Sequence, residues 1–355
     1  MKKNGWHKVL SIAAATLCMV GALSGCTGGS GDTDTTATTT TTVPTTTRTT
    51  GTPTTIYASS APELELSSPT GERPDAEIFE RLAAICKANK DSVSLYYKDL
   101  ETGYTITYRE DEIYQAASVI KAPYVKYLLA SETDWSKELT MTTKQGGSKY
   151  IDNQPTGTKF TVGELMEYTI RYSDNTAYYM LNKEFDFTGF NAYAANLGIR
   201  ANKARNLTLK FSKPRFGYLS AYDVGTYMED IARYIDTGTD SAKQLYSWMI
   251  TTEEQSQLCA AYNGKKYTIE QLKNPETLNA AYNVRKSGYT VAHKYGEQDY
   301  GEAWNRAYHD GAIVWRDHPY VLAITSTLKP HTDASDKVFH DVAALIDQMQ
   351  TDWYK

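Results

Sequence analysis

Apolar residues recur at helical spacing along much of the chain. In the segment Ala76–Ala88, for example, the side chains of Ile78, Leu82 and Ile85 fall on one face of a helix. The same spacing predicts further helices at Ser118–Ala130, Val162–Tyr172, Asn175–Lys183, Phe190–Leu197, Tyr222–Tyr234, Ser241–Met249 and Ser335–Trp353.

Short apolar segments bounded by turn residues predict strands. Ser92–Lys98 and Thr105–Tyr108 flank the turn at Glu101–Gly103 and are expected to form a hairpin. Three more strands, rich in Val, Ile, Tyr and Ala, are predicted near the C-terminus at Tyr289–Lys294, Ala307–Trp315 and Tyr320–Thr327.

The order of these elements predicts an α/β fold of the α+β type. A hairpin and a helix come first, helices fill the middle, and strands and a helix return at the end. This order favours an antiparallel sheet built from both chain ends and flanked by helices, with a mainly helical subdomain inserted between them. We place this domain at 74–355, with its α/β part at 74–117 and 285–355 and its helical part at 118–284. A small-molecule site is expected in the crevice between the two parts.

The N-terminus has the pattern of a secretory signal, which we place at residues 1–25. Early lysines precede the apolar run Val9–Leu23, which is short for a membrane span. The run ends in Leu23-Ser24-Gly25-Cys26, which resembles a bacterial lipobox. That resemblance implies a lipid on Cys26 and attachment to the outer face of a bacterial cell membrane. The alternative is an ordinary signal peptide that contains a cysteine.

Residues 26–73 differ from the rest of the chain in composition. Sixteen of the 23 residues from Thr33 to Thr55 are Thr. Such a segment has little apolar surface to bury and cannot offset the entropy lost on ordering, so we expect a disordered tether.

Composition and charge exclude several classes of protein. A net charge of −5 argues against a nucleic-acid-binding protein, which needs a basic face. The 28 tyrosines argue against a largely disordered chain. The six His have no metal-binding spacing, so we expect no metal and no cofactor. We also expect a monomer. The domain keeps Cys86 and Cys259, either as a disulfide or as two buried thiols.

A serine and a lysine stand three residues apart at the start of a predicted helix. Ser118 and Lys121 would lie on the same helical face. A desolvated lysine can lose its proton and accept one from the hydroxyl, while the helix N-terminus supplies N–H groups for an oxyanion. The pattern alone is weak, because one match is expected by chance in a chain of this length.

Two further polar motifs follow in the sequence. Ser173 and Asn175 could relay a proton and bind a substrate amide, although Ser-Asp-Asn is also good helix-capping chemistry. Lys294, Tyr295 and Gly296 close an apolar strand. A lysine there could attract an anionic substrate, and glycine permits close backbone approach, but a solvent-facing strand end would look the same.

Taken together, the three motifs resemble those of class A β-lactamases and penicillin-binding proteins. S-x-x-K, S-D-N and K-T-G occur in these families in the same order. The resemblance covers about 74–355 and implies the β-lactamase/D,D-peptidase-like fold. It implies that Ser118 is the acylated nucleophile, that Lys121 is its base, and that Ser173 relays the proton. Asn175 would hold the substrate and Lys121, and Lys294 would supply positive charge. The backbone N–H groups of Ser118 and Glu297 would form the oxyanion hole, and Tyr295 and Gly296 would line the substrate site.

Two departures from the family pattern bear on the chemistry. Tyr295 replaces the Thr of K-T-G, which puts recognition of a substrate carboxylate in doubt. The segment between Leu197 and Ser220 contains no Asp or Glu, whereas the family's Ω-loop carries the Glu that activates the deacylating water. We therefore expect slow deacylation, unless Glu184, Asp223, Glu297 or a second action of Lys121 replaces that base.

The sequence leaves three functions open. The first is a serine hydrolase that forms an acyl-enzyme with β-lactams. The second is a D,D-peptidase or other peptidoglycan amide hydrolase that uses the same residues on a stem peptide. The third is a non-catalytic or esterase-like relative that binds cell-wall fragments, although the five intact polar residues argue against a dead enzyme.

Overall fold

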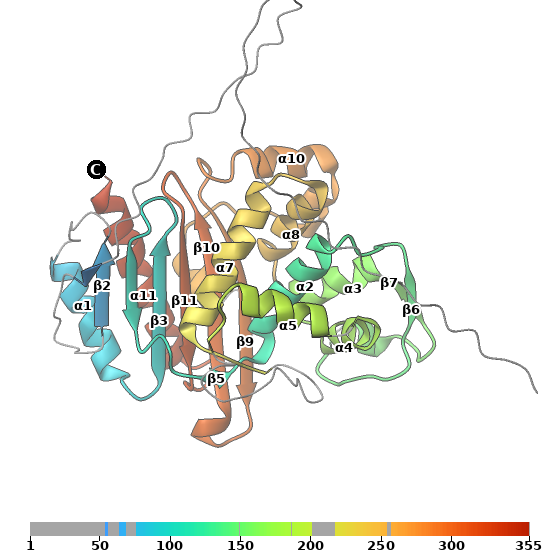
Figure 1. The fold of residues 1–355 in the computed structure, drawn as a ribbon, viewed down its shortest axis with the longest axis horizontal. Coiled ribbons are helices and arrows are strands. Elements are labelled where there is room, and N and C mark those ends of the chain that lie inside the picture. Colours follow the sequence, from blue (N-terminus) through green and yellow to red (C-terminus); the bar gives the residue numbers. More distant parts are fainter. Residues whose placement is uncertain are drawn as a thin grey trace, which may run out of the picture. The chain divides into compact units, whose positions relative to one another are not determined.

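A computed structural model of the protein has a central sheet with helices packed around it (Figure 1). The structure describes residues 54–55, 64–68, 76–148, 150–185, 187–200, 217–253 and 257–354. All of them belong to one unit that spans 50–355. The predicted signal peptide, Cys26 and most of the predicted tether lie outside the described residues, as does the basic segment 201–216.

A seven-stranded antiparallel sheet forms the centre of the fold, in the order β1-β2-β4-β3-β11-β10-β9. The strands are β1 (Thr54–Thr55), β2 (Leu64–Ser68), β3 (Val93–Asp99), β4 (Thr105–Tyr108), β9 (Thr290–Asp299), β10 (Arg306–Trp315) and β11 (Tyr320–Ser326). Because β3 pairs with β11, strands from the two ends of the chain meet in mid-sheet, which confirms the predicted fold class.

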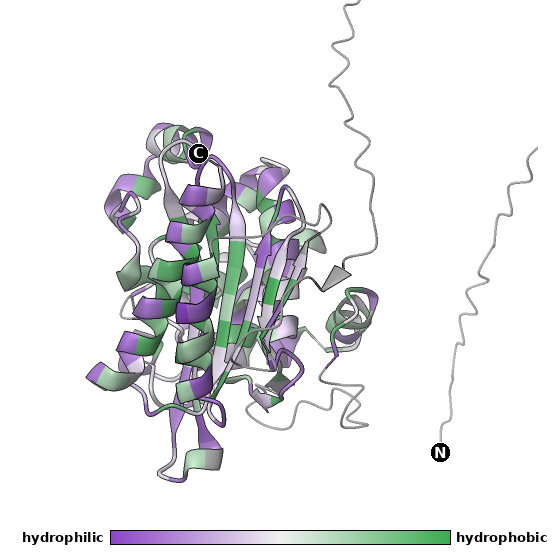
Figure 2. Ribbon diagram, turned by 90° about the vertical axis from the view of Figure 1, so that its left-hand side faces the viewer, coloured by the Kyte–Doolittle hydropathy of each residue, from purple (hydrophilic) through white to green (hydrophobic). Residues whose placement is uncertain are grey.

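Helices cover both faces of the sheet. On one face lie α1 (Ala76–Ala88) and α11 (Asp333–Trp353), which contribute to the same apolar core as the strands. On the other lies α7 (Ala221–Asp236), which contacts β3, β10 and β11. Figure 2 shows hydrophobic stretches along the strands and alternating hydrophobic and hydrophilic bands along the helices, as burial of one helical face requires.

Small residues let α7 approach the sheet closely. A Cβ on Gly225 of α7 would lie 2.0 Å from the Tyr96 ring, and one on Gly311 of β10 would lie 2.6 Å from Val224. No side chain fits at either position, so both glycines are required by packing.

The helical subdomain lies beside the edge strand β9 (Figure 1). Its helices are α2 (Lys121–Ala130), α3 (Val162–Arg171), α4 (Asn175–Glu184), α5 (Phe187–Asn196), α8 (Asp240–Met249), α9 (Ile269–Lys273) and α10 (Pro275–Asn283). Short 3₁₀ segments are η1 (Ala117–Ile120), η2 (Ile151–Asn153), η3 (Leu258–Ala261) and η4 (Ala303–Asn305). Two small ladders pair β5 (Tyr114–Gln115) with β8 (Tyr218–Leu219) and β6 (Glu138–Thr140) with β7 (Lys159–Thr161).

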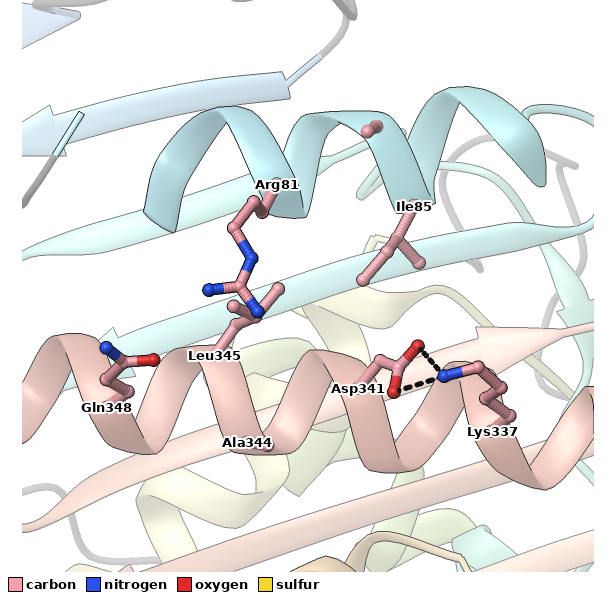
Figure 3. A pocket seen from close by; sticks show the side chains of 8 residues that line it. Arg81, Ile85, Lys337, Asp341, Ala344, Leu345 and Gln348 are labelled. Atoms are coloured by element: carbon pink, nitrogen blue, oxygen red, sulfur yellow. Dashed lines mark hydrogen bonds and ion pairs between the residues drawn. The ribbon is translucent and has the colours of Figure 1, made fainter. Parts of the chain in front are cut away.

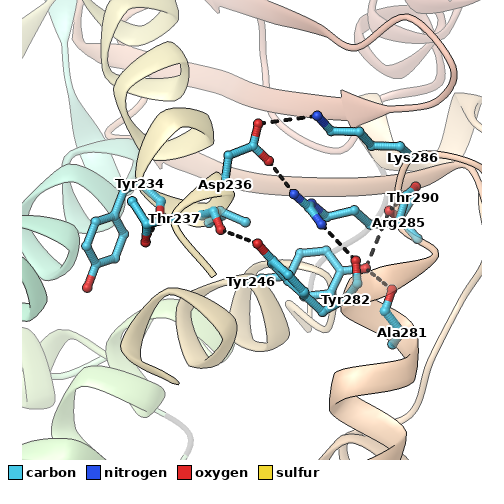
Figure 4. Close-up of polar contacts among 10 residues, drawn as sticks. Tyr234, Asp236, Thr237, Tyr246, Ala281, Tyr282, Arg285, Lys286 and Thr290 are labelled. Atoms are coloured by element: carbon cyan, nitrogen blue, oxygen red, sulfur yellow. Dashed lines mark hydrogen bonds and ion pairs between the residues drawn. The ribbon is translucent and has the colours of Figure 1, made fainter. Parts of the chain in front are cut away.

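The chain returns from this subdomain to the sheet at Arg285 (Figure 4). The Arg285 guanidinium pairs with Asp236 at the end of α7 and donates to the Tyr282 carbonyl oxygen at 2.9 Å. The Arg285 carbonyl oxygen in turn accepts a hydrogen bond of 3.1 Å from Thr290, the first residue of β9. These contacts fix the start of β9 relative to α7 and α10.

A hollow of about 410 Å³ lies between α1 and α11. Arg81 and Ile85 reach into it from α1, and Lys337, Asp341 and Leu345 from α11 (Figure 3). None of the residues that line it belongs to the Ser118, Ser173 or Lys294 motifs.

Two expectations need correction or completion. The tether prediction is wrong for two strands within 26–73. Residues 64–68 form β2, with Leu64 and Leu66 buried in the core, and Thr54–Thr55 form β1, which pairs with β2. Cys86 and Cys259 are buried and are not joined in a disulfide, and burial raises the pKa of the Cys86 thiol to about 12. Within the described part of the chain, no helix has the length and apolar character needed to cross a bilayer.

Candidate active site

The predicted nucleophile lies in a strained turn. Ser118 is half-buried in η1, between β5 and α2. Ala117, directly before it, has a φ of 45°, which a residue with a Cβ rarely adopts. Such a conformation persists only where its surroundings hold it in place.

A buried histidine holds the segment before this turn. His309 of β10 accepts a hydrogen bond at Nδ1 from the Ser326 N–H (2.9 Å), so Nε2 carries the proton and donates to the Gln115 carbonyl oxygen (2.7 Å). Burial lowers the pKa of His309 to about 4. The ring is therefore neutral at physiological pH, and its two hydrogen bonds link the turn to the middle of the sheet.

The Gln115 side chain adds a second attachment to the sheet. Its Oε1 accepts a hydrogen bond from the Gln298 amide at 2.7 Å, and its Nε2 donates to Asn305 Oδ1 at 2.8 Å. The next residue, Ala116, donates its backbone N–H to the Gly217 carbonyl oxygen at 3.0 Å. The position of Ser118 is thus set by β9, β10 and β8 together.

Lys121 begins α2 and is completely buried. Its Nζ donates to the Ser173 carbonyl oxygen at 2.5 Å and to Asn175 Oδ1 at 2.7 Å, and it lies 3.3 Å from Ser173 Oγ. Burial, reinforced by the charge of Lys294, holds the pKa of Lys121 well below its usual value. A lysine of this kind can be neutral and accept a proton.

The Ser-Asp-Asn motif divides its work between capping and the site. Asp174 caps α4, accepting a hydrogen bond from the Ala177 N–H at 2.8 Å. The capping interpretation therefore holds for Asp174, whereas Ser173 turns toward Lys121 and Lys294. Ser173 has a φ of 51°, a second strained position in the site.

A loop that the sequence analysis did not select supports Asn175. Ser148 Oγ accepts hydrogen bonds from the backbone N–H groups of Asn175 (2.9 Å) and Thr176 (3.0 Å). The Asn175 amide nitrogen donates to the Gly146 carbonyl oxygen at 3.3 Å. Because the amide nitrogen is held there, the oxygen faces Lys121.

Lys294 lies on β9, fully buried, on the other side of Ser173. Its Nζ donates to Ser173 Oγ at 3.0 Å and to the Tyr295 carbonyl oxygen at 2.9 Å. Burial lowers the pKa of Lys294 to about 7, although the carboxylates of Asp310 and Glu297 act in the opposite direction. The Ser173 hydroxyl is therefore flanked by both lysines.

Gly296 lies against the nucleophile turn. A Cβ at this position would lie 2.8 Å from the Ser118 nitrogen and 2.7 Å from the Val119 nitrogen, so only glycine fits. The contact brings the backbone of β9 beside the first N–H groups of η1. The neighbouring Glu297 directs its carboxylate to His331, at 2.7 Å from Nε2.

A buried histidine–aspartate pair adjoins Lys294 and was missed in the sequence. His293 Nδ1 lies 3.0 Å from Asp310 Oδ2, and Nε2 lies 2.5 Å from Thr252 Oγ1. Burial acts to lower the pKa of His293, but the Asp310 carboxylate outweighs it and raises the pKa to about 10. Asp310 thus contributes negative charge near both His293 and Lys294. No sequence motif marked it, because the pair forms only when β9 and β10 align.

The three carboxylates considered as substitute bases all have other partners. Glu184 pairs with Lys137. Asp223 accepts hydrogen bonds from the Ser220 N–H (3.1 Å) and the Arg200 N–H (2.6 Å). Glu297 pairs with His331, as described above. Use of any of them as a base would require these contacts to break.

The fold and the site together define a class of protein. Acyl transfer requires a nucleophile, a base and a proton relay; a serine at a 3₁₀ turn, a buried lysine one turn later and a second serine between two lysines are groups of these kinds. They lie where the edge of an antiparallel sheet meets a helical subdomain.

The family follows from comparison with known sequences. The profile described as "Beta-lactamase enzyme family" matches residues 77–350. The chain therefore belongs to the β-lactamase enzyme family, and this membership supports an enzyme of the serine-hydrolase type.

Individual relatives are distant. A β-lactamase of Streptomyces fradiae is 23% identical over 316 residues, which cover 84% of this chain and 95% of that protein. One of Mycobacterium tuberculosis is 29% identical over 284 residues, covering 76% and 82%. The β-lactamase ROB-1 of Haemophilus influenzae is 28% identical over 137 residues, which cover 38% of this chain and only 45% of ROB-1.

Solved structures show the same fold. PBP-A superposes with a TM-score of 0.59 at 20% identity, covering 79% of this chain and 98% of PBP-A. A β-lactamase from Sphaerobacter thermophilus gives a TM-score of 0.61 at 17% identity, covering 79% and 98%. At these identities the likeness is one of fold.

Proposed function

We propose that this protein hydrolyses β-lactam amide bonds through an acyl-enzyme on Ser118. The Ser118 hydroxyl oxygen attacks the carbonyl carbon, and Lys121 Nζ accepts its proton. The observation that carries the proposal is the complete burial of Lys121 between Ser173 and Asn175, because burial lowers the pKa of a lysine and favours the neutral form that can accept a proton. General-base assistance of this kind is typically worth about 10²–10⁴-fold in rate.

The remaining residues serve the collapse of the tetrahedral intermediate. The backbone N–H groups of Ser118 and Glu297 stabilise its oxyanion, as donors fixed before the reaction do. Ser173 Oγ, which accepts a hydrogen bond from Lys294 and lies 3.3 Å from Lys121 Nζ, passes its proton to the leaving nitrogen and takes from Lys121 the proton removed from Ser118. The amide oxygen of Asn175 holds Lys121 in place, and the second N–H of its amide nitrogen, beside the one directed to Gly146, donates to the substrate.

Deacylation is the slow step in this proposal. No Asp or Glu lies between residues 198 and 217, and the three other carboxylates considered are paired elsewhere. Without a base to activate water, the ester should persist, at a cost of about 10²–10⁴-fold in rate. A variant of PBP-A has been solved as an acyl-enzyme complex with penicillin G, which supports the same first step here.

A D,D-peptidase or penicillin-binding protein is the second candidate. The same residues would acylate Ser118 with a peptidoglycan stem peptide, and the missing carboxylate would make β-lactam adducts long-lived. The similarity of its fold to that of PBP-A supports this second function.

One experiment separates these functions. The purified domain is incubated with a fluorescent penicillin, and nitrocefin hydrolysis is followed in the steady state after stopped-flow acylation. We expect a burst of one equivalent followed by a slow phase. Turnover of hundreds per second without a burst would show that a deacylating base is present. A persistent adduct with no turnover favours the peptidase, and absence of any adduct would contradict both enzymatic proposals.

We also propose that the mature protein is a monomer, attached to the outer face of a bacterial cell membrane through a lipid on Cys26. The lipobox-like Leu23-Ser24-Gly25-Cys26 and the Thr-rich segment behind it support this location. A diacylglyceryl group together with an N-terminal acyl chain gives stable attachment, which one chain alone does not.

A further inference from the structure

The side chains of Lys294 and Tyr295 contact each other at the edge of the proposed substrate site. The Lys294 ammonium lies 3.8 Å from the centre of the Tyr295 ring. An ammonium over a ring face at this distance is attracted by the ring's quadrupole. Lys294 is 0% exposed and Tyr295 is 7% exposed, so solvent does not compete with this contact.

The lysine already uses its donors inside the protein. An ammonium group has three N–H bonds. One is directed to Ser173 Oγ at 3.0 Å and one to the Tyr295 carbonyl oxygen at 2.9 Å, and the Tyr295 ring covers a further side of the ammonium. A substrate anion would have to displace one of these partners to reach Lys294.

The other lysine of the site is occupied in the same way. Lys121 Nζ donates to the Ser173 carbonyl oxygen and to Asn175 Oδ1, and it is 0% exposed. Within the described site, both lysines therefore direct their donors to protein groups. A carboxylate entering there would lose water without gaining a hydrogen bond from either lysine, so it would bind no better than a neutral group.

We propose that the Tyr295 ring occupies the position at which Lys294 would pair with an anionic substrate group, so that a carboxylate beside the scissile bond does not speed acylation and neutral acyl compounds react as readily as anionic ones. Amides and esters are the classes that fit, for example a peptide whose neighbouring carboxyl group is amidated. This inference rests on the proposed acylation of Ser118, and it assigns to Lys294 a role toward Ser173 rather than toward the substrate.

The test compares benzylpenicillin with its methyl ester, which differ only in this carboxylate. The second-order acylation rate constant is measured for both by intact-mass spectrometry, and the acid-to-ester ratio is the readout. In the unaltered protein we expect a ratio within about threefold of one. Tyr295→Thr should raise the ratio about 10- to 100-fold, the range expected for a hydrogen bond to a charged group.

Two variants control the interpretation. Tyr295→Phe keeps the ring and should keep the ratio, whereas a fall in the ratio would mean that the tyrosine hydroxyl binds the carboxylate and would overturn the inference. Tyr300→Thr removes a tyrosine that is 70% exposed beyond the end of β9 and should leave the ratio unchanged.

The remaining outcomes separate the two levels of the proposal. An unaltered protein that prefers the acid by more than 100-fold, or a Tyr295→Thr variant with the same ratio, would refute the inference while leaving Ser118 acylation intact. If neither compound labels the protein, phenylboronic acid and 3-carboxyphenylboronic acid are titrated as reversible serine ligands, and the ratio of their dissociation constants replaces the rate ratio. Failure of all four compounds to bind would refute the proposed function together with the inference.

Discussion

The contact between Gly296 and the nucleophile turn gives the sharpest test of the site geometry. In Gly296→Ala, the added Cβ would lie 2.7 Å from the Val119 nitrogen and 2.8 Å from the Ser118 nitrogen. Ordinary contacts of a Cβ begin near 3.4 Å, so β9 and η1 must separate by about 0.6–0.7 Å. The obstructing atoms are backbone atoms and cannot rotate away.

The magnitude follows from what this separation moves. Ser118 belongs to η1 and Glu297 to β9, the two segments that would separate, so the proposed oxyanion hole would widen. Misplacing reacting groups by 1 Å costs about 100-fold in rate, and loss of one oxyanion donor costs about 10²–10³-fold. We expect the acylation rate constant of Gly296→Ala to fall about 30- to 300-fold.

Stopped-flow acylation by a fluorescent penicillin measures this loss, and urea unfolding measures stability in parallel. Gly163→Ala is the matched control, because its Cβ would meet the Trp135 carbonyl oxygen at 3.5 Å, an ordinary contact. It should acylate like the unaltered protein. If Gly296→Ala also acylates at the unaltered rate while folded, the proposed oxyanion hole is wrong.

Three other perturbations test separate parts of the proposal. Ser118→Ala should abolish covalent β-lactam labelling and Lys121→Ala should reduce it at least 100-fold; intact-mass spectrometry showing an adduct on Ser118→Ala would place the nucleophile elsewhere. Lys294 has a pKa of about 7 in the fold and a higher one when unfolded, so between pH 7 and 10 the unfolded chain binds the extra proton and stability rises with pH. Lys294→Met should therefore reduce the slope of the unfolding free energy against pH by about 1 kcal/mol per pH unit, measured by urea unfolding at several pH values. Lys337→Met, at an exposed lysine, is the control. An unchanged slope in Lys294→Met would contradict the lowered pKa of Lys294. Cys26→Ala should release the processed protein from the membrane fraction, and complete retention would refute the lipid anchor.

Periodicity predicted the large elements, because each buries a long apolar face. Helix α11 and strands β10 and β11 lie close to their predicted ranges for this reason. Strand β2 was missed because its alternation spans five residues and adjoins a Thr-rich segment whose composition indicates disorder. The two-residue ladder of β5 and β8 has no periodicity to detect, yet it adjoins the nucleophile turn.

The motifs selected the polar residues of the site but not the residues that hold them. Ser118, Lys121, Ser173 and Lys294 belong to short local patterns. His309 acts on Gln115 across 194 positions of sequence. A lone histidine in a strand carries no sign of such a contact, since only the pairing of strands creates it.

The backbone is strained directly before Ser118 and at Ser173, the two serines of the site. Ala117 and Ser173 both adopt positive φ, each at a cost of about 1–3 kcal/mol. One is held by the hydrogen bonds of Gln115 and Ala116 to strands, and the other by the Asp174 cap and the two lysines. The first set of restraints comes mainly from the sheet, whereas the second combines Asp174 and Lys121 of the helical subdomain with Lys294 of β9, so the site forms where the two parts meet. The same arrangement explains why the proposed chemistry can be predicted from three short motifs, while its geometry depends on contacts between residues far apart in the chain.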